Sequence, residues 1–242
     1  MNQWVWTAVV IESMALLGVV GVSFTKRTQF AFVTGFNTIL PVTIIYLAYA
    51  PAFATRQMII LGMVLIYLAH INWLLLFQQR HTAISKLNTQ IPLSQKVSLS
   101  FILTNAAGWG YCLPFYFAAR RTEGLGAVDY AAIIVYLLGT IIHFGSDYQK
   151  VRFKAKSESH GKVLDTGFWR FSRHPNYFGD FLIYISFALI GGNIWSWVAP
   201  LLNLLQYLFD AIPKNEQWAL QRYGKSWEEY VRHTKKFIPF IY

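Results

Sequence analysis

Apolar residues run through this chain in long blocks that short polar stretches separate. A helix needs about 20 mainly apolar residues to cross a hydrocarbon core of about 30 Å. Seven blocks predict transmembrane helices at residues 4–24, 29–50, 57–77, 97–119, 127–145, 177–190 and 193–209. The last two blocks are short, and only Gly191 and Gly192 lie between them, which predicts a tight helical hairpin. The pattern therefore predicts an all-α, polytopic membrane protein with about seven spans.

The composition supports this class. Of the 242 residues 55% are hydrophobic, 17% are aromatic and only 13% are charged, whereas a soluble domain carries about 25% charged residues. The single cysteine, Cys112, excludes an internal disulfide framework and a cysteine-based zinc site, and no metal is expected. We expect one integral membrane domain over residues 1–242, with a four-helix half at 1–120 and a second half at 121–242.

The basic residues are distributed unequally between the two sides of the predicted bundle. Of the 21 Lys and Arg residues, 18 follow the first, third, fifth or seventh span, and only Arg56, Arg120 and Arg121 fall on the other side. Because cytoplasmic loops are enriched in Lys and Arg, the amino terminus is predicted outside and the carboxyl terminus in the cytosol. Topology thus accounts for the net charge of +10, and nucleic acid is not an expected partner.

Two cytosolic segments are too long to be simple turns. The connector at 149–172 is basic, and connectors of this length usually carry function or are disordered. The tail at 214–242 places apolar side chains at spacings of three and four residues, which predicts an amphipathic interfacial helix. These side chains are Trp218, Ala219, Tyr223, Trp227 and Tyr230.

Polar side chains within the predicted spans are candidate functional residues, because they are costly to place in lipid. A backbone carbonyl or a neighbouring helix can also satisfy each one singly. Together they predict a polar pocket that opens to the cytosolic face. They are Glu12, Asn37, His70, Asn72, His143 and Asp180.

The densest polar motif is the stretch at 161–180. Pro175 disfavours helix at His174, so a new helix is predicted to begin near Asn176. The amino end of a helix carries free amide groups and a partial positive charge, and Lys162, Arg170 and Arg173 lie just before it. This combination predicts a site for phosphate or another anion.

Three separated sequence blocks stand out in the second half of the chain. The first block is Asp-Tyr-Gln-Lys-Val-Arg-Phe-Lys at 147–154, and the second runs from Gly-Lys-Val-Leu-Asp at 161 to Arg-His-Pro-Asn-Tyr-Phe-Gly-Asp, which ends at 180. The third block comprises Lys-Asn-Glu at 214–216, Arg-Tyr-Gly-Lys-Ser-Trp-Glu-Glu-Tyr at 222–230 and Phe-Ile-Pro-Phe-Ile-Tyr at 237–242. In this order the blocks resemble the steroid 5-alpha-reductase C-terminal domain family and the sterol reductases, whose superfamily also contains the isoprenylcysteine carboxyl methyltransferases.

The resemblance implies an integral membrane oxidoreductase that uses NADPH to reduce a carbon–carbon double bond in a steroid-like lipid. The enzyme would be of the 3-oxo-5-alpha-steroid 4-dehydrogenase or sterol reductase type. The first half would hold the lipid and the second half the cofactor. Lys214-Asn215 departs from the Arg-Asp of sterol reductases, and His143 stands where relatives carry Asn or Glu. The implied cofactor-binding residues are Asp147, Lys162, Trp169, Arg170, Arg173, His174, Asn176, Tyr177, Asp180, Lys214, Glu216 and Tyr223.

The residues that would polarise the substrate carbonyl follow less directly from the resemblance. Steroid 5-alpha-reductases use a Glu near the start of the second span and a Tyr in the third. This chain has no carboxylate in the first of these regions. His70, Asn37 or Tyr67 would replace that pair, or the substrate is not a 3-oxo steroid. Glu12, the only acid in the first four spans, is a further candidate.

Two other functions remain open from the sequence. Membrane methyltransferases of the isoprenylcysteine type carry a similar Arg-His-Pro-x-Tyr hairpin and would bind S-adenosylmethionine there. A membrane scaffold or transporter is the non-enzymatic alternative, although no internal repeat is visible. In each reading the chain is a multi-pass protein of the bacterial inner membrane or the endoplasmic reticulum. Membrane lipids and a lipid-like substrate are its expected partners, and no obligate protein partner is indicated.

Overall fold

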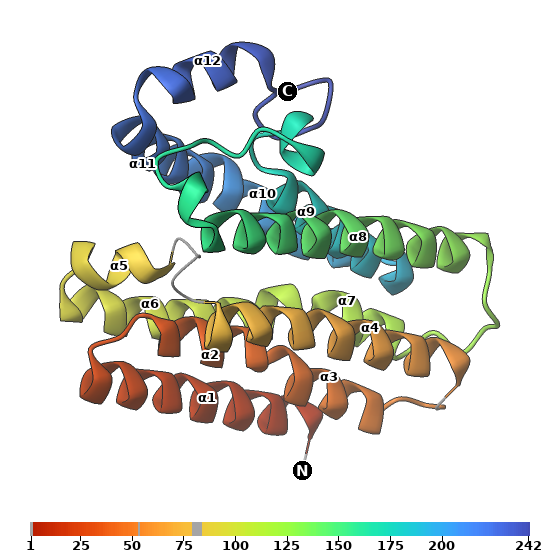
Figure 1. Cartoon of the computed structure of the whole chain (residues 1–242). Coiled ribbons are helices and arrows are strands. Elements are labelled where there is room, and N and C mark those ends of the chain that lie inside the picture. The colour runs from red at the N-terminus through yellow and green to blue at the C-terminus, as the bar shows by residue number, and fades with distance from the viewer. Residues whose placement is uncertain (1, 53, 79–83) are drawn as a thin grey trace. The chain divides into compact units, whose positions relative to one another are not determined.

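The computed structural model describes residues 2–52, 54–78 and 84–242. Helices are the only regular elements among these residues, and no strand occurs among them (Figure 1). The predicted all-α class is therefore confirmed. The chain divides into two compact units. Unit 1 comprises Met1–Ala132 and Phe187–Ala199, and unit 2 comprises Ile133–Ser186 and Pro200–Tyr242.

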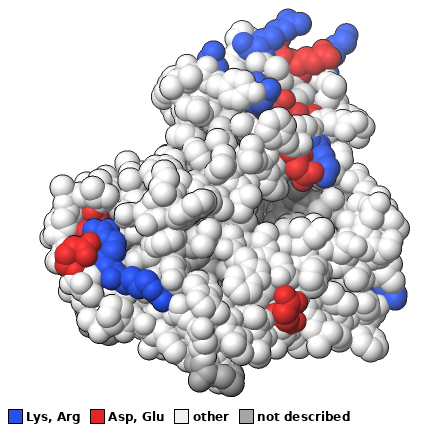
Figure 2. All heavy atoms as spheres, turned by 180° about the vertical axis from the view of Figure 1, so that it is seen from behind, with Lys and Arg blue, Asp and Glu red and all other residues white. Residues whose placement is uncertain are grey.

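Four helical segments among the described residues are long and apolar enough to cross a membrane. They are Gln3–Thr25, Gln29–Ala48, Thr55–Phe77 and Ala127–Ala155. Large apolar side chains are exposed along them, and most of the surface seen in Figure 2 is uncharged. Because water does not favour such a surface, the chain is a membrane protein. The other three predicted spans, at 97–119, 177–190 and 193–209, remain predictions.

The amino-terminal helices of unit 1 follow the predicted spans closely. A break after Asn37 divides the second predicted span, four residues before Pro41, whose ring nitrogen cannot donate a helical hydrogen bond to the Asn37 carbonyl. The third span ends in a π-helical turn. The elements are α1 (Gln3–Thr25), α2 (Gln29–Asn37), α3 (Ile39–Ala48), α4 (Thr55–Asn72) and η1 (Trp73–Phe77).

The predicted span at 97–119 is helical but interrupted. A π-helical turn, η3, separates its two α-helices, and Pro114 lies in the first turn of the second. Proline suits that position because its missing N–H has no partner there. The elements are α5 (Ile84–Gln90), α6 (Leu93–Asn105), η3 (Ala106–Tyr111) and α7 (Leu113–Ala118).

Two glycines let α1 pack tightly within unit 1. A Cβ at Gly18 would lie 2.3 Å from both Ser100 Oγ and Thr34 Oγ1, and a Cβ at Gly108 would lie 2.3 Å from the Ile11 side chain. A larger residue at position 18 would therefore displace the Ser100 and Thr34 hydroxyls at the contacts of α1 with α6 and α2.

A buried ion cluster also stabilises unit 1. Arg56, which is 2% exposed, donates to both carboxylate oxygens of Asp129 at 3.0 and 2.9 Å. It also donates to the backbone carbonyls of Arg121, Glu123 and Gly124. Arg121 binds Asp129 at 3.0 Å as well. A bidentate guanidinium with all its remaining donors satisfied can be buried at low cost.

Unit 2 contains most of helix α8 (Ala127–Ala155), which continues ten residues beyond the predicted end at 145. The first part of the predicted connector at 149–172 is therefore helical, contrary to the prediction. Gly192 has φ +63° and follows directly on α9, so the predicted turn after that helix is present. The next elements along the chain are η4 (Ser157–Ser159), η5 (Gly167–Arg170), α9 (Pro175–Gly191), η6 (Ile194–Trp197), α10 (Val198–Gln206) and η7 (Tyr207–Ala211). Of these, η6 and the end of α9 belong to unit 1.

Helices α8 and α9 approach each other through two glycines. A Cβ at Gly179 would lie 2.4 Å from the backbone nitrogen of His143 and 2.8 Å from the Gly139 carbonyl oxygen. A Cβ at Gly139 would meet the same stretch of α9 backbone at 2.8 Å. Backbone atoms cannot rotate away as a side chain can, so both positions require glycine. This contact sets the spacing of the side chains described below.

The carboxyl-terminal tail forms two helices where the sequence predicts one. Helix α11 (Ile212–Tyr223) ends at Gly224, which has φ +52°, and α12 (Lys225–His233) follows. Trp227 and Tyr230, two members of the predicted apolar face, are buried, and the Tyr230 hydroxyl donates to the Trp169 carbonyl. That part of the face is therefore occupied by protein contacts within unit 2.

Candidate functional site

The polar side chains of unit 2 gather where α8, the start of α9 and the region of α10 to α11 meet. Pro175 is the first residue of α9, as its effect on His174 predicts, and the His174 backbone N–H donates to Ser172 Oγ at 3.1 Å. The turn before the helix therefore fixes the direction in which the following side chains leave the backbone.

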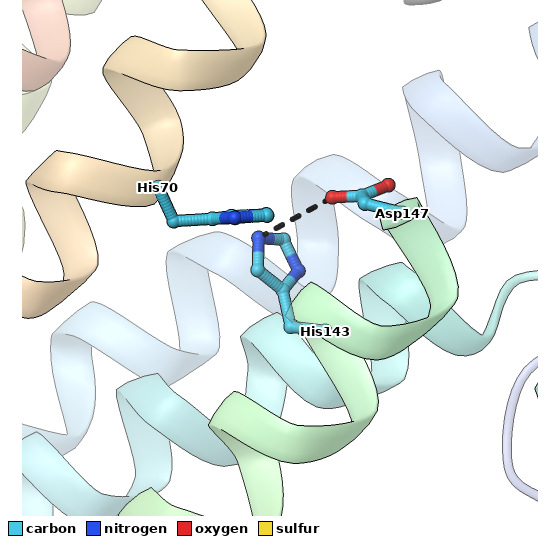
Figure 3. Close-up of side chains that lie close together, drawn as sticks. All are labelled: His70, His143 and Asp147. Atoms are coloured by element: carbon cyan, nitrogen blue, oxygen red, sulfur yellow. Dashed lines mark ion pairs between the residues drawn. The ribbon is translucent and has the colours of Figure 1, made fainter. Parts of the chain in front are cut away.

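His143, Asp147 and Asn176 form a group between α8 and α9 that two hydrogen bonds and one longer contact connect. His143 Nδ1 donates to the Asn176 carbonyl at 2.7 Å, and Asn176 Nδ2 donates to Asp147 Oδ1 at 3.0 Å. His143 Nε2 lies 3.8 Å from Asp147 Oδ2, one helical turn along α8 (Figure 3). Asp147 and Asn176, which are implied cofactor-binding residues, are thus brought together.

Arg173, His174 and Glu216 form a second group. Glu216 Oε1 accepts from Arg173 Nε at 2.7 Å and from His174 Nε2 at 3.3 Å. Arg173 Nη1 also donates to the Thr234 carbonyl at 2.6 Å. Burial opposes the ionisation of Glu216, but the hydrogen bonds from His174 and Arg173 and the positive charge of Arg173 outweigh it and lower the pKa of this carboxyl to about 2.

The charge on Arg173 is therefore balanced by protein. Burial also lowers the pKa of the His174 imidazole, although its hydrogen bond to Glu216 acts in the opposite direction. The sequence predicts that Arg173 lies before a helix and binds an anion, and the anion that it contacts here is Glu216.

Three rings stack beside this group. The His174 and Tyr177 rings lie 5.5 Å apart at an interplanar angle of 4°, and the Tyr177 and Tyr207 rings lie 4.4 Å apart at 10°. The Tyr177 hydroxyl accepts from Asn215 Nδ2 at 2.8 Å. Asn215, which stands where sterol reductases carry Asp, therefore holds an aromatic ring in place.

Asp180 is 2% exposed and lies at the centre of a third group. Its Oδ2 accepts from Asn203 Nδ2 at 2.9 Å and from the Tyr207 hydroxyl at 2.6 Å. Asp180 Oδ1 and Asn203 Oδ1 are both buried, and neither has a hydrogen-bond donor among the described residues. Buried acceptors without donors are costly, so this position favours a molecule that brings N–H or O–H groups.

The other implied cofactor-binding residues occupy varied positions. Trp169 is buried, donates from Nε1 to the Ser146 carbonyl at 3.1 Å and lies under the Lys150 ammonium. Tyr223 is half-buried at the end of α11. The exposed cations among these residues are Lys162, Arg170 and Lys214, and a charged ligand can reach them from water. Lys214 also forms an ion pair with Asp210.

The predicted substrate-side residues all lie in unit 1. Asn37 and Asn72 exchange hydrogen bonds at 2.8 and 2.9 Å, which engages both amides. Tyr67 and His70 are buried, and the His70 ring lies 5.6 Å from that of Trp73. Glu12 is exposed on α1, so the structure does not group it with these three.

Sequence reasoning missed Asn203 and Tyr207, the two partners of Asp180. Asn203 is an amide within a predicted span, and the rule that singles out costly polar residues in spans would have found it. Tyr207 offered no such signal, because tyrosine is common near membrane boundaries.

Comparison with known proteins agrees with the resemblance seen in the sequence. A Delta(14)-sterol reductase of Schizosaccharomyces pombe is 25% identical over 86% of this chain and 54% of its own length. A steroid 5-alpha-reductase of Arabidopsis thaliana is 30% identical over 46% of this chain and 40% of its own. A probable protein-S-isoprenylcysteine O-methyltransferase of Oryza sativa is 27% identical over 47% and 62%.

The matches cover between 20% and 54% of the length of the sterol reductases. It falls within the superfamily that contains these reductases and the isoprenylcysteine methyltransferases. One family covers nearly the whole chain, from residue 17 to residue 234. The chain therefore belongs to that family, which is described as protein of unknown function (DUF1295).

Proposed function

We propose that this protein is a multi-pass membrane reductase that uses NADPH to reduce a carbon–carbon double bond in a sterol-like lipid. The observation that carries the proposal is the pair of buried acceptors, Asp180 Oδ1 and Asn203 Oδ1, which lack donors among the described residues. They lie beside the stacked rings of Tyr177 and Tyr207, in the part of the chain whose sequence motifs resemble those of the reductases.

The chemistry of these groups fits a pyridine dinucleotide. The carboxamide of a nicotinamide carries two N–H donors, which is what two buried acceptors require. The stack of Tyr177 and Tyr207 offers aromatic surface of the kind that planar heterocycles contact. Lys162, Arg170 and Lys214 are exposed cations that can neutralise phosphates.

Each protein group has a definite part in this proposal. NADPH supplies a hydride to one carbon of the double bond, and the other carbon receives a proton. Asp180 and Asn203 orient the carboxamide, and Tyr207 holds Asp180 in position through its hydroxyl. Asp147 and Asn176 fix the start of α9 against α8. Glu216 keeps the buried Arg173 and His174 paired, so that neither is left without an acceptor.

The lipid would reach the protein from the bilayer. A flat apolar substrate is soluble there, whereas the dinucleotide is soluble in the cytosol, so the two would enter from different directions. The excess of basic residues after alternate spans supports an amino terminus outside and a carboxyl terminus in the cytosol. Tyr67, His70 and Asn37 in unit 1 are the candidates for contact with a substrate oxygen.

A binding experiment with purified protein in detergent tests the cofactor. We expect saturable binding of NADPH, followed by tryptophan fluorescence, and weaker binding of S-adenosylmethionine. Asn203→Leu removes one acceptor and should weaken NADPH binding about tenfold, because a buried hydrogen bond contributes about 1–1.5 kcal/mol. Asp165→Asn, on the exposed connector, is the matched control and should bind like the parent.

A second function is supported by one comparison. The rice methyltransferase is 27% identical over 47% of this chain. In that case the same acceptors would receive the ammonium of S-adenosylmethionine. Saturable binding of S-adenosylmethionine without NADPH binding would favour the methyltransferase and reject the reductase.

A further inference from the structure

Residues 237–242 form a tight turn that is anchored in unit 2. The Phe237 backbone N–H donates to the Tyr242 carbonyl at 2.6 Å, and the Tyr242 backbone N–H donates to the Ile238 carbonyl at 3.0 Å. Ser172 Oγ, from the segment that precedes α9, donates to the Phe237 carbonyl at 2.8 Å. The turn is therefore fixed in position relative to the start of α9.

The turn lies level with apolar parts of α8 and α9. The Phe237 ring is buried, and its centre lies 5.9 Å from the ring centres of both Phe178 and Phe181 on α9. Between these two residues lies Gly179, where a Cβ would meet the α8 backbone at His143. Helix α8 is long and apolar enough to cross a membrane, and His143 lies just inside the end of its apolar stretch. Where α8 crosses the bilayer, the turn is thus level with the edge of the hydrocarbon core.

Four large apolar side chains are exposed at this turn, and we call them the tail patch. Phe240 and Ile241 are 75% and 74% exposed, and Tyr242 and Phe171 are 50% and 45% exposed. The Phe171 and Phe240 rings lie 5.4 Å apart. Phe240 has φ +67°, which bulky residues rarely adopt, and such strain persists only where the surrounding structure maintains it. The turn therefore holds an aromatic ring outward against the preference of its backbone.

Two lysines lie beside the tail patch. Lys236 Nζ donates to the Tyr242 hydroxyl at 3.1 Å, and an ammonium has further donors for a phosphate oxygen. Lys235 is exposed, and its carbonyl accepts from the Arg173 backbone N–H at 2.8 Å. No Asp or Glu occurs within four residues of either lysine in the sequence. Apolar and positively charged groups together fit the boundary between acyl chains and anionic headgroups.

We propose that the tail patch contacts the membrane surface and binds anionic phospholipid, whose phosphate lies against Lys235 and Lys236. Aromatic side chains are enriched at the boundary between lipid and water, and lysines near an anionic surface are attracted to it. The sequence predicts an interfacial contact through Trp227 and Tyr230, but these side chains are buried in protein. The turn takes their place. The proposed cofactor site uses neither lysine, so the two proposals are independent.

Spin labelling of the full chain in lipid nanodiscs tests the depth of the turn. Cys112, the only cysteine, is fully buried, so a nitroxide on Ile241→Cys should report on the turn alone. We expect molecular oxygen, which dissolves in lipid, to relax this label more strongly than a water-soluble nickel chelate does. Glu229→Cys, at a 62% exposed position of α12, is the matched control and should show the reverse order. A label at Ile241→Cys that responds more to the nickel chelate, or that neither reagent reaches because protein covers it, would overturn the proposal.

Quenching by labelled lipids tests the role of charge. A fluorophore on Ile241→Cys should be quenched by doxyl-labelled phosphatidylglycerol at about a fivefold lower lipid fraction than by doxyl-labelled phosphatidylcholine, since one lysine near the surface contributes about that factor. Lys235→Gln combined with Lys236→Gln should make the two lipids nearly equal. Arg232→Gln, at a 72% exposed position that pairs with Glu229, is the matched control and should keep the preference. Equal quenching by both lipids before these substitutions, or a preference that survives the double substitution, would refute the anionic lipid site.

Discussion

Arg173, which lies two residues before the start of α9, forms a largely buried ion pair with Glu216 of helix α11. Their Nε and Oε1 atoms are 2.7 Å apart, and the side chains are 6% and 22% exposed. The two residues are 43 positions apart in the chain, and the hydrogen-bond partners of their side chains lie in unit 2. This pair therefore ties the carboxyl-terminal tail to the start of α9.

We expect Glu216→Gln to lower the stability of the folded protein at neutral pH. The pKa of Glu216 is lowered from its ordinary value to about 2, so the unfolded state binds a proton more readily than the folded state. The carboxylate thus contributes up to about 3 kcal/mol above pH 4.5, and this contribution fades as the pH falls toward 2. Thermal unfolding of both proteins across this range measures the difference.

Glu229→Gln is the matched control. Glu229 pairs with His233 on the exposed side of α12, where both side chains are more than half exposed. An exposed pair contributes about 0–1 kcal/mol. A loss for Glu229→Gln as large as that for Glu216→Gln would show that the tail responds to charge alone and not to the buried pair.

His174 should make the stability of the protein depend on pH near neutrality. Burial lowers the pKa of its imidazole below 6.5, the ordinary value, so the unfolded state takes up a proton first as the pH falls. The contribution of His174 to the free energy of unfolding is therefore present above pH 6.5 and is lost as the pH falls below that value. His174→Gln should flatten the dependence of melting temperature on pH between about 7.5 and 5.5. His233→Gln, at an exposed position, should leave the slope unchanged.

Gly179→Ala should separate α8 from α9. The added methyl group would lie 2.4 Å from the His143 backbone nitrogen, and backbone cannot yield. Overpacking of this kind costs about 1–3 kcal/mol or more, and it would displace Asn176 from Asp147. We expect a lower melting temperature together with loss of NADPH binding.

Gly62→Ala is the corresponding control in α4. No atom lies within 4 Å of a Cβ at that position, and alanine favours a helix over glycine by about 0.5–1 kcal/mol. We therefore expect unchanged or slightly raised stability. Equal destabilisation by both substitutions would mean that close approach of α8 and α9 is not the reason for glycine at 179.

Local rules predicted the parts of the fold that depend on few residues. Pro175 begins α9 because a proline restricts the residue before it and fits the first helical turn. The predicted end of α8 at residue 145 was wrong, because charged residues end an apolar block of the sequence without ending the helix. Gln149 lies beyond that block, yet its Oε1 accepts from the Phe168 backbone N–H, which supports continued helix there.

The pairing of polar residues could not be predicted, since it depends on tertiary packing. Asp180 was identified because a carboxyl group is costly to place within a membrane span, but its hydrogen-bond partners lie 23 and 27 residues away along the chain. The sequence likewise did not predict on which face of its helix Glu12 lies. A uniformly apolar helix has little periodicity, so the sequence does not tell which face is buried.

Arg56→Gln should be among the most destabilising substitutions in unit 1. Arg56 is buried, binds Asp129 with two hydrogen bonds and satisfies three backbone carbonyls, none of which glutamine can reach in the same arrangement. Removal of one partner of a buried ion pair costs about 3–5 kcal/mol where the other charge is left unpaired. Because Arg121 still pairs with Asp129, we expect a loss of about 3 kcal/mol, at the lower end of this range. Arg56→Lys should recover little of the lost stability, since a single ammonium lacks the planar fork that binds both carboxylate oxygens.

Thermal unfolding in detergent measures the loss of stability for each variant. The control is Glu123→Gln, at a 58% exposed position of the same cluster, which should cost about 0–1 kcal/mol. A loss at Glu123 equal to that at Arg56 would contradict a cluster centred on the buried pair.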